Sequence, residues 1–195
     1  MNDSKLFIPI LLGTPRKHRE SGHVAKWLLG KIEERGDEIE TKFFDVRDFN
    51  LPQDDYGMEI KDDFPEWRDA MTRADGLVIV TPEYNQGYPG TLKSVLDLLL
   101  PEYIHKAVAF AAVSAQAWGG VRVIEALIQT SRELGFAVTF TDLNFPRVQT
   151  LFDEDGNLLD EKAYESRVKA FLDELVWMSK TLRWGRENLP SRFHS

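Results

Sequence analysis

Apolar runs and helical spacings alternate along this chain. Strand-like apolar runs occur at residues 6–12, 39–46, 76–81, 106–113 and 136–143. Between and after them, apolar residues recur every three or four positions, which predicts helices: one that ends near residue 36, then 65–73, 89–100, 121–134 and 160–182. Five strands that alternate with helices are typical of a doubly wound parallel sheet. We therefore predict an α/β fold with five parallel strands and helices on both faces.

Two segments fit this pattern less simply. Pro9 lies inside the first apolar run, where a central strand needs an N–H donor that proline lacks. We expect a bulge or a shifted strand to accommodate it. Residues 47–64 are polar for most of their length and predict a long loop.

Composition limits the classes of protein and of site. The 195 residues are 43% hydrophobic and 29% charged, as expected for one globular domain spanning residues 1–195. The net charge of -8 argues against nucleic-acid binding. Without cysteine, the chain has no disulfide, thiolate metal site or cysteine nucleophile. The histidines lack metal-ligand spacing, and no signal peptide or membrane-length apolar run is visible, so we expect no metal, no membrane contact and a cytoplasmic location.

The loop after the first strand has the residues of an anion site. It reads GTPRKHRES and leads into a helix, whose N-terminus presents unpaired N–H groups and a positive dipole end. Hydroxyl and guanidinium groups suited to phosphate come from Thr14, Arg16, Arg19 and Ser21. The sequence contains neither a triphosphate P-loop nor the dinucleotide glycine fingerprint. A strand–glycine–helix junction with solvated arginines is the alternative interpretation.

Two further loops should reach the same edge of the sheet, because ligands bind beyond the carboxyl ends of parallel strands. TPEYNQGYPG offers aromatic faces, an amide and a carboxylate, as a flat heterocycle requires. SAQAWGG offers two glycines for close backbone approach, and Trp118 to cover a ring or to pack. The alternative is an ordinary connecting loop, in which Pro, Gly and Asn are common.

All three loops resemble motifs of the NAD(P)H-dependent FMN reductases and quinone reductases of flavodoxin-like fold. The segment PEYNQGYPGTLKSVLD is the most specific of them. The resemblance implies that FMN phosphate binds Thr14, Arg16, Arg19 and Ser21. It implies that the isoalloxazine and ribityl chain contact Pro82, Glu83, Tyr84 and Asn85. It also implies that the other edge of the ring meets Ser114, Gln116, Trp118 and Gly119.

The resemblance also implies an activity. Two electrons would pass from NADPH or NADH through FMN to a quinone or similar small acceptor, in ping-pong order, and no catalytic side chain is required because the flavin carries the chemistry. Two alternatives stay open: an electron carrier of flavodoxin type, and a flavin-bound regulatory protein.

A homodimer, or a dimer of dimers, is the expected assembly. The helix predicted at residues 89–100 is apolar over more than one stripe, through Leu98, Leu99 and Leu100. Such a surplus should face a second copy, and the resemblance implies the same. Alternatively, the loop at residues 47–64 covers it within one chain.

Overall fold

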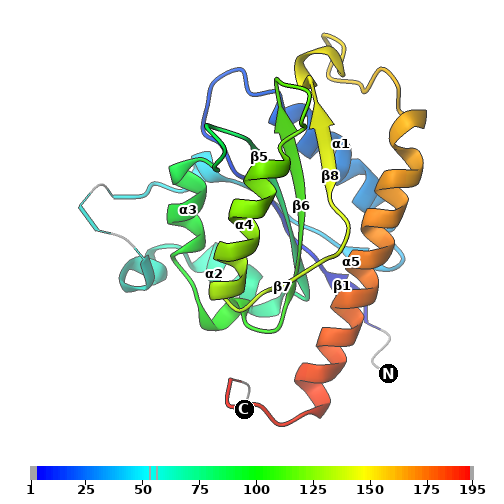
Figure 1. Cartoon of the computed structure of the whole chain (residues 1–195). Coiled ribbons are helices and arrows are strands. Elements are labelled where there is room, and N and C mark those ends of the chain that lie inside the picture. Colours follow the sequence, from blue (N-terminus) through cyan, green and yellow to red (C-terminus); the bar gives the residue numbers. More distant parts are fainter. Residues whose placement is uncertain (1–3, 53, 56, 194–195) are drawn as a thin grey trace.

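The fold is a parallel sheet between two layers of helices (Figure 1). The computed structural model describes residues 4–52, 54–55 and 57–193. The sheet has the order β4 (Phe43–Asp45), β2 (Ile10–Leu12), β5 (Gly76–Pro82), β6 (Ala107–Ser114) and β7 (Ala137–Val138), and β8 (Leu143–Pro146) also pairs with β6. Numbered by passes of the chain, this is the flavodoxin order 2-1-3-4-5. The predicted α/β class is therefore confirmed.

Three of the five predicted strands are divided, so the sheet has six strands rather than five and is accompanied by a two-stranded ladder of β1 (Leu6–Phe7) and β3 (Ile39–Glu40). Pro9 causes the first division. Its carbonyl still accepts the Val78 N–H at 2.9 Å, whereas the N–H of its neighbour Ile8 bonds to Glu40 at 2.9 Å. The chain therefore keeps its direction and loses only the donor that proline lacks.

The last predicted strand is also interrupted. β7 pairs with the first residues of β6 and β8 pairs with its last ones, while residues 139–142 leave the ladder. Thr139 is the first residue of the break, and its hydroxyl donates to the Val108 carbonyl at 3.3 Å. The prediction of one continuous strand at residues 136–143 is therefore wrong, although both β7 and β8 run beside β6.

Five helices cover the two faces. α1 (Ser21–Glu33) and α5 (Lys162–Asn188) pack on one face, and α2 (Pro65–Arg73), α3 (Gly90–Leu96) and α4 (Val121–Glu133) pack on the other (Figure 1). Short 3-10 turns lie at Val46–Asp48, Gly57–Asp63, Pro101–Tyr103 and Val148–Thr150. α2 matches its predicted bounds, with Pro65 in the first turn where a missing N–H costs nothing. α3 ends four residues earlier than predicted, and α5 ends six residues later.

The leucines after α3 are buried within the chain. Leu98 and Leu99 are at most 1% exposed, in the same core cluster as Ile60 from the 47–64 segment. Phe49, Leu51 and Phe64 from that segment pack against the same cluster. The surplus apolar surface is therefore covered by this chain's own loop, and the argument for a dimer from that helix was wrong.

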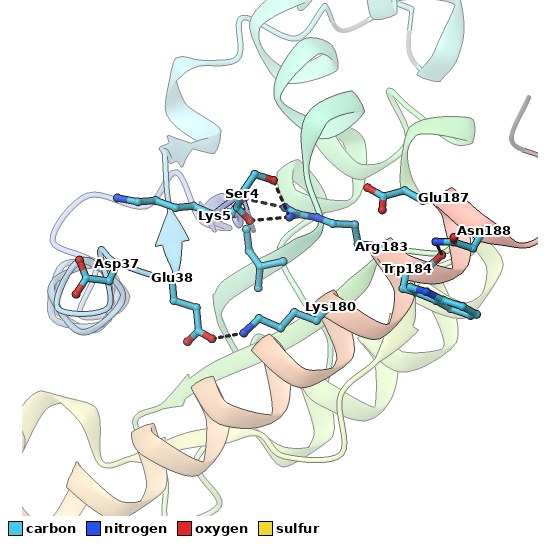
Figure 2. A pocket seen from close by; sticks show the side chains of 10 residues that line it. Ser4, Lys5, Asp37, Glu38, Lys180, Arg183, Trp184, Glu187 and Asn188 are labelled. Carbon is cyan, nitrogen blue, oxygen red and sulfur yellow. Dashed lines mark hydrogen bonds and ion pairs between the residues drawn. The ribbon is translucent and has the colours of Figure 1, made fainter. Parts of the chain in front are cut away.

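A buried carboxylate fastens α5 to the edge of the sheet opposite the strand carboxyl ends. Asp75 is 4% exposed, accepts the Phe7 N–H at 3.0 Å, and pairs with Arg183 and Arg186. Arg183 also donates to the Ser4 carbonyl at 2.8 Å, which closes one side of a groove of about 740 Å³ (Figure 2). Among the described residues, no helix has the length and apolar character needed to cross a bilayer.

Candidate functional site

Loops from four strands meet at the carboxyl edge of the sheet and enclose a pocket of about 360 Å³. Eight residues expected from the sequence line it: Thr14, Arg16, Arg19, Ser21, Pro82, Glu83, Tyr84 and Ser114. The pocket therefore combines the predicted phosphate loop with parts of the two predicted ring-binding loops.

The first loop holds its hydroxyls beneath the pocket. Gly13 donates to the Val80 carbonyl at 2.8 Å, and a Cβ there would lie 2.8 Å from the end of the Leu92 side chain, so a larger residue would require Leu92 to shift. Thr14 is buried, and its Oγ1 is 3.1 Å from the Tyr84 hydroxyl. Ser21, the first residue of α1, has a buried hydroxyl without a hydrogen-bond partner among the described residues. Ser21 is also one of the residues that line the pocket.

Arg19 has a different role from the one expected. Its guanidinium pairs with Asp45 at the end of β4, and one of its nitrogens also donates to the Thr14 carbonyl. Arg47 similarly ties the loop by donating to the Pro15 carbonyl at 3.0 Å. Arg19 therefore fixes the shape of the loop, whereas Arg16 is exposed at the pocket without an ion pair to any described residue.

The second loop is a tight hairpin. Tyr84 and Gly87 exchange both backbone hydrogen bonds, at 2.8 and 2.9 Å. Asn85 and Gln86 between them have φ of 49° and 71°, as a two-residue hairpin turn requires. Asn85 is exposed at the tip and does not line the pocket, in contrast to the expectation. The Glu83 backbone N–H continues the ladder by donating to the Val113 carbonyl at 2.9 Å, and the Glu83 Oε2 is buried with no partner within the described ranges.

The third loop contributes less of its length than expected. Ser114 and Ala115 line the pocket, whereas Gln116, Trp118 and Gly119 do not. Trp118 is 64% exposed. The glycines are needed for packing: a Cβ at Gly120, where φ is 85°, would lie 2.6 Å from the Ala112 Cβ. Gly120 thus brings the start of α4 against β6, and Gly119 lies against Asn144 and Pro146 of β8.

Sequence reasoning missed several lining residues. Val148 and Gln149 follow β8, and the Gln149 amide donates to the Ala115 carbonyl at 3.3 Å. The expected motifs ended before this segment, yet the end of a fifth parallel strand at the same edge was a usable signal. His18 and Glu20 also line the pocket, from within the predicted phosphate loop.

The arrangement suits a planar ligand that carries a phosphate. Ser21 and Arg16 supply anion donors at one end. Pro82, Tyr84 and Val113 supply flat or apolar walls beside them.

Comparisons with known proteins identify the family. A family model described as NADPH-dependent FMN reductase matches residues 8–149. An NADPH azoreductase of Bacillus sp. (strain OY1-2) is 34% identical over 122 residues, which is 60% of this chain and 64% of that protein, so less than two thirds of its length is covered. A quinone reductase of Pseudomonas putida is 27% identical over 176 residues, covering 87% of this chain and 92% of that protein.

A solved structure shares the fold. The flavoenzyme FerB, an NAD(P)H:acceptor oxidoreductase from Paracoccus denitrificans, superposes with a TM-score of 0.69 at 22% identity, covering 90% of this chain and 98% of that one. The family model covers well over half of the chain, including the strand ends and loops that enclose the pocket. The chain therefore belongs to the NADPH-dependent FMN reductase family.

Proposed function

We propose that this protein is an FMN-dependent NAD(P)H oxidoreductase that reduces a quinone or a similar small aromatic acceptor. The observation that carries the proposal is the buried hydroxyl of Ser21, which has no partner in the described part of the chain, at a residue that lines the pocket enclosed by the family loops. A buried hydroxyl without a partner is costly, and a phosphate oxygen would satisfy it.

The lining residues fit FMN. In the proposed complex Ser21 and Arg16 donate to the phosphate, and Thr14 Oγ1 lies beside it, supported by Tyr84. The backbone from Pro82 to Tyr84 borders the flat part of the ligand, and Ser114 lies beside it at the end of the neighbouring strand β6. The hairpin that follows Tyr84 keeps this border rigid, which lowers the conformational entropy lost on binding.

FMN, when bound, accepts a hydride from NAD(P)H and passes two electrons on. The balanced reaction consumes NAD(P)H, one proton and the acceptor, and yields NAD(P)⁺ and the two-electron-reduced acceptor. The residues of this chain hold and orient the participants. Since the pocket is small, we propose that the dinucleotide and the acceptor occupy its mouth in turn, which gives ping-pong kinetics. The names of the relatives support quinones and azo compounds as acceptors and NADPH as donor.

Purified protein tests this proposal directly. It should show the visible absorption of oxidised flavin, lose that absorption when NADPH is added without oxygen, and regain it when a quinone follows. Initial rates at several fixed quinone concentrations should give parallel double-reciprocal lines. A flavin that NADPH and NADH leave oxidised would favour the electron carrier instead, and negligible turnover with every acceptor would favour a regulatory protein.

We also propose a single domain over residues 1–195 and a homodimer. The dimer rests on the family resemblance, because the leucines that first suggested it are buried within the chain.

A further inference from the structure

A second pocket adjoins the proposed FMN pocket, on the side of β4. It has a volume of about 330 Å³ and shares His18 and Arg19, both from the phosphate loop at residues 13–21, with the FMN pocket. Its other walls come from the first two turns of α1, from the end of β4 and from the hairpin at residues 152–158. A ligand that extends past the phosphate loop can therefore enter this second pocket.

The lining of the second pocket is basic. Five basic side chains accompany two carboxylates there, although the whole chain has a net charge of -8. The basic side chains are those of His18, Arg19, His23, Lys26 and Arg47, and the carboxylates are those of Asp45 and Asp155. By contrast, the 740 Å³ groove in Figure 2 has three basic and three acidic side chains. The second pocket is therefore suited to an anion.

One of the two carboxylates is already engaged. Asp45 pairs with Arg19 and also accepts the Arg47 backbone N–H at 3.0 Å. The Arg47 guanidinium donates to the Pro15 carbonyl at 3.0 Å, and a carbonyl carries no net charge that would neutralise it. Among the described residues that line the pocket, Asp155 is the one carboxylate outside an ion pair. The positive charge of the lining therefore exceeds what its own carboxylates neutralise.

The spacing of basic residues at the start of α1 brings them to one wall. His23 and Lys26 are three residues apart and so lie on the same side of the helix, one turn after Arg19. The His23 Nδ1 atom is buried and has no hydrogen-bond partner among the residues that the structure describes. A Cβ at Gly156 would lie 2.8 Å from that atom, so glycine leaves room beside the imidazole. A residue of the lining thus carries a polar atom that the chain itself leaves unsatisfied.

We propose that the second pocket binds the 2′-phosphate of NADPH, and that Lys26 contributes to a preference for NADPH over NADH. A nicotinamide that reacts with the flavin lies near Pro82, Tyr84 and Ser114, so the adenosine end of the dinucleotide is the part that reaches past the phosphate loop. NADPH differs from NADH only by the 2′-phosphate, an anionic group that basic side chains bind through charge-assisted hydrogen bonds. This inference rests on the proposed function, because it assigns the donor specificity of the same site.

Calorimetric titration of the FMN-loaded protein with NADP⁺ and with NAD⁺ tests this proposal without turnover. Lys26→Gln should weaken NADP⁺ binding by roughly three- to fivefold, the size of a contact between exposed charges, and leave NAD⁺ binding nearly unchanged. Asp155→Asn should act in the opposite direction and strengthen NADP⁺ binding by roughly twofold, because it removes a negative charge from the lining. Both variants change an exposed side chain, so the protein should fold and bind FMN as the wild type does.

Lys17→Gln and Glu154→Gln are the matched controls, because Lys17 and Glu154 are exposed and line neither pocket. They should leave both affinities unchanged. Equal losses of NADP⁺ and NAD⁺ affinity in Lys26→Gln would indicate the pyrophosphate instead and overturn the assignment. An unchanged NADP⁺ affinity in either test variant, an equal change in its control, or no NADP⁺ binding at millimolar concentration would also overturn it. A flavin that NADPH and NADH leave oxidised would refute the proposed function, whereas these titrations would still report on the second pocket.

Discussion

At the scale of single residues, the hydrogen bonds of Ser21 and Arg19 distinguish a side chain that can bind a ligand from one that holds the loop in place. The Ser21 hydroxyl is buried and has no partner among the residues that the structure describes, a state that costs about 1–3 kcal/mol and that a ligand oxygen would relieve. The Arg19 guanidinium already bonds to Asp45 and to the Thr14 carbonyl. Ser21 and Arg16 are therefore available to a phosphate, whereas Arg19 holds the loop that positions them.

Binding of FMN, which has a phosphate, and of riboflavin, which has none, should distinguish the role of Arg16 from that of Arg19. Arg16→Ala should weaken FMN binding by roughly tenfold, equivalent to about 1.4 kcal/mol, and leave riboflavin binding nearly unchanged. Arg19→Ala should weaken both flavins, because the loop loses its anchor. Fluorescence quenching during titration measures each affinity. Lys17→Ala, an exposed neighbour outside the pocket lining, is the control. Equal losses of FMN and riboflavin affinity in Arg16→Ala would contradict the phosphate assignment.

Most of the pocket could be predicted from the sequence, because the ends of parallel strands must meet at one edge. The misplaced residues have a common cause. Asn85 and Trp118 have the right chemistry but lie at exposed positions, and exposure depends on the turn and the helix start rather than on residue type. Gln149 was missed for the opposite reason: its residue type carries no signal, and only the position of β8 brings it to the wall.

At the scale of elements, α2 ends against a buried amine. Lys106, 5% exposed at the start of β6, donates to the last carbonyls of α2, those of Met71 and Thr72. Burial, together with the positive charge of Arg186, lowers the pKa of this amine to about 7, although Asp75 and Glu102 oppose the shift. The lysine therefore caps a helix while it is close to losing its proton.

This pKa shift makes stability depend on pH in a defined direction. In the unfolded chain the Lys106 pKa is near its ordinary value of 10.5, so between pH 7 and 10 the unfolded state binds more protons than the folded one. The free energy of unfolding should then rise with pH, by up to about 1.4 kcal/mol per unit. Urea unfolding from pH 7 to 9 measures the slope. Lys106→Met should flatten it, and Lys26→Met, at an exposed lysine of α1, should not; equal slopes would refute the assignment.

Element bounds were predictable where local chemistry is decisive. Pro65 marks the start of α2, and the β-branched run of β5 marks a strand buried on both faces. The break at residues 139–142 was not predictable, because Phe136 to Leu143 has the composition of one strand. α3 stops at Leu96 for a tertiary reason: Leu98 and Leu99 turn into the core under the 47–64 segment.

At the scale of the whole molecule, the two helical layers leave the carboxyl edge of the sheet to the pocket and the opposite edge to both ends of the chain (Figure 1). The core on one face includes Ile60, with Phe49 and Leu51 packed against it, so a long loop completes a layer that helices alone leave open. The sequence pattern predicts which faces of a helix are apolar, but it does not show which distant loop will cover them.

The proposed homodimer is a prediction at this scale. Light scattering of the FMN-loaded protein at micromolar concentration should give twice the mass of one chain. Leu98→Ala leaves a cavity in a buried cluster, so it should lower stability by about 2–5 kcal/mol without changing the mass. A monomer with bound FMN and full activity would refute the dimer. If the wild type is a dimer and Leu98→Ala a monomer, the surface formed by the leucines after α3 would be the dimer interface.

The carboxylate that fastens α5 to the sheet has a consequence for the order of events during synthesis on the ribosome. Asp75 is translated about a hundred residues before its partners Arg183 and Arg186. A buried charge without its partner costs about 3–5 kcal/mol, which is a large part of a domain's stability. The nascent chain should therefore close its sheet stably only after α5 has left the exit tunnel. Chains released before α5 is made should be degraded rather than accumulate as partly active fragments.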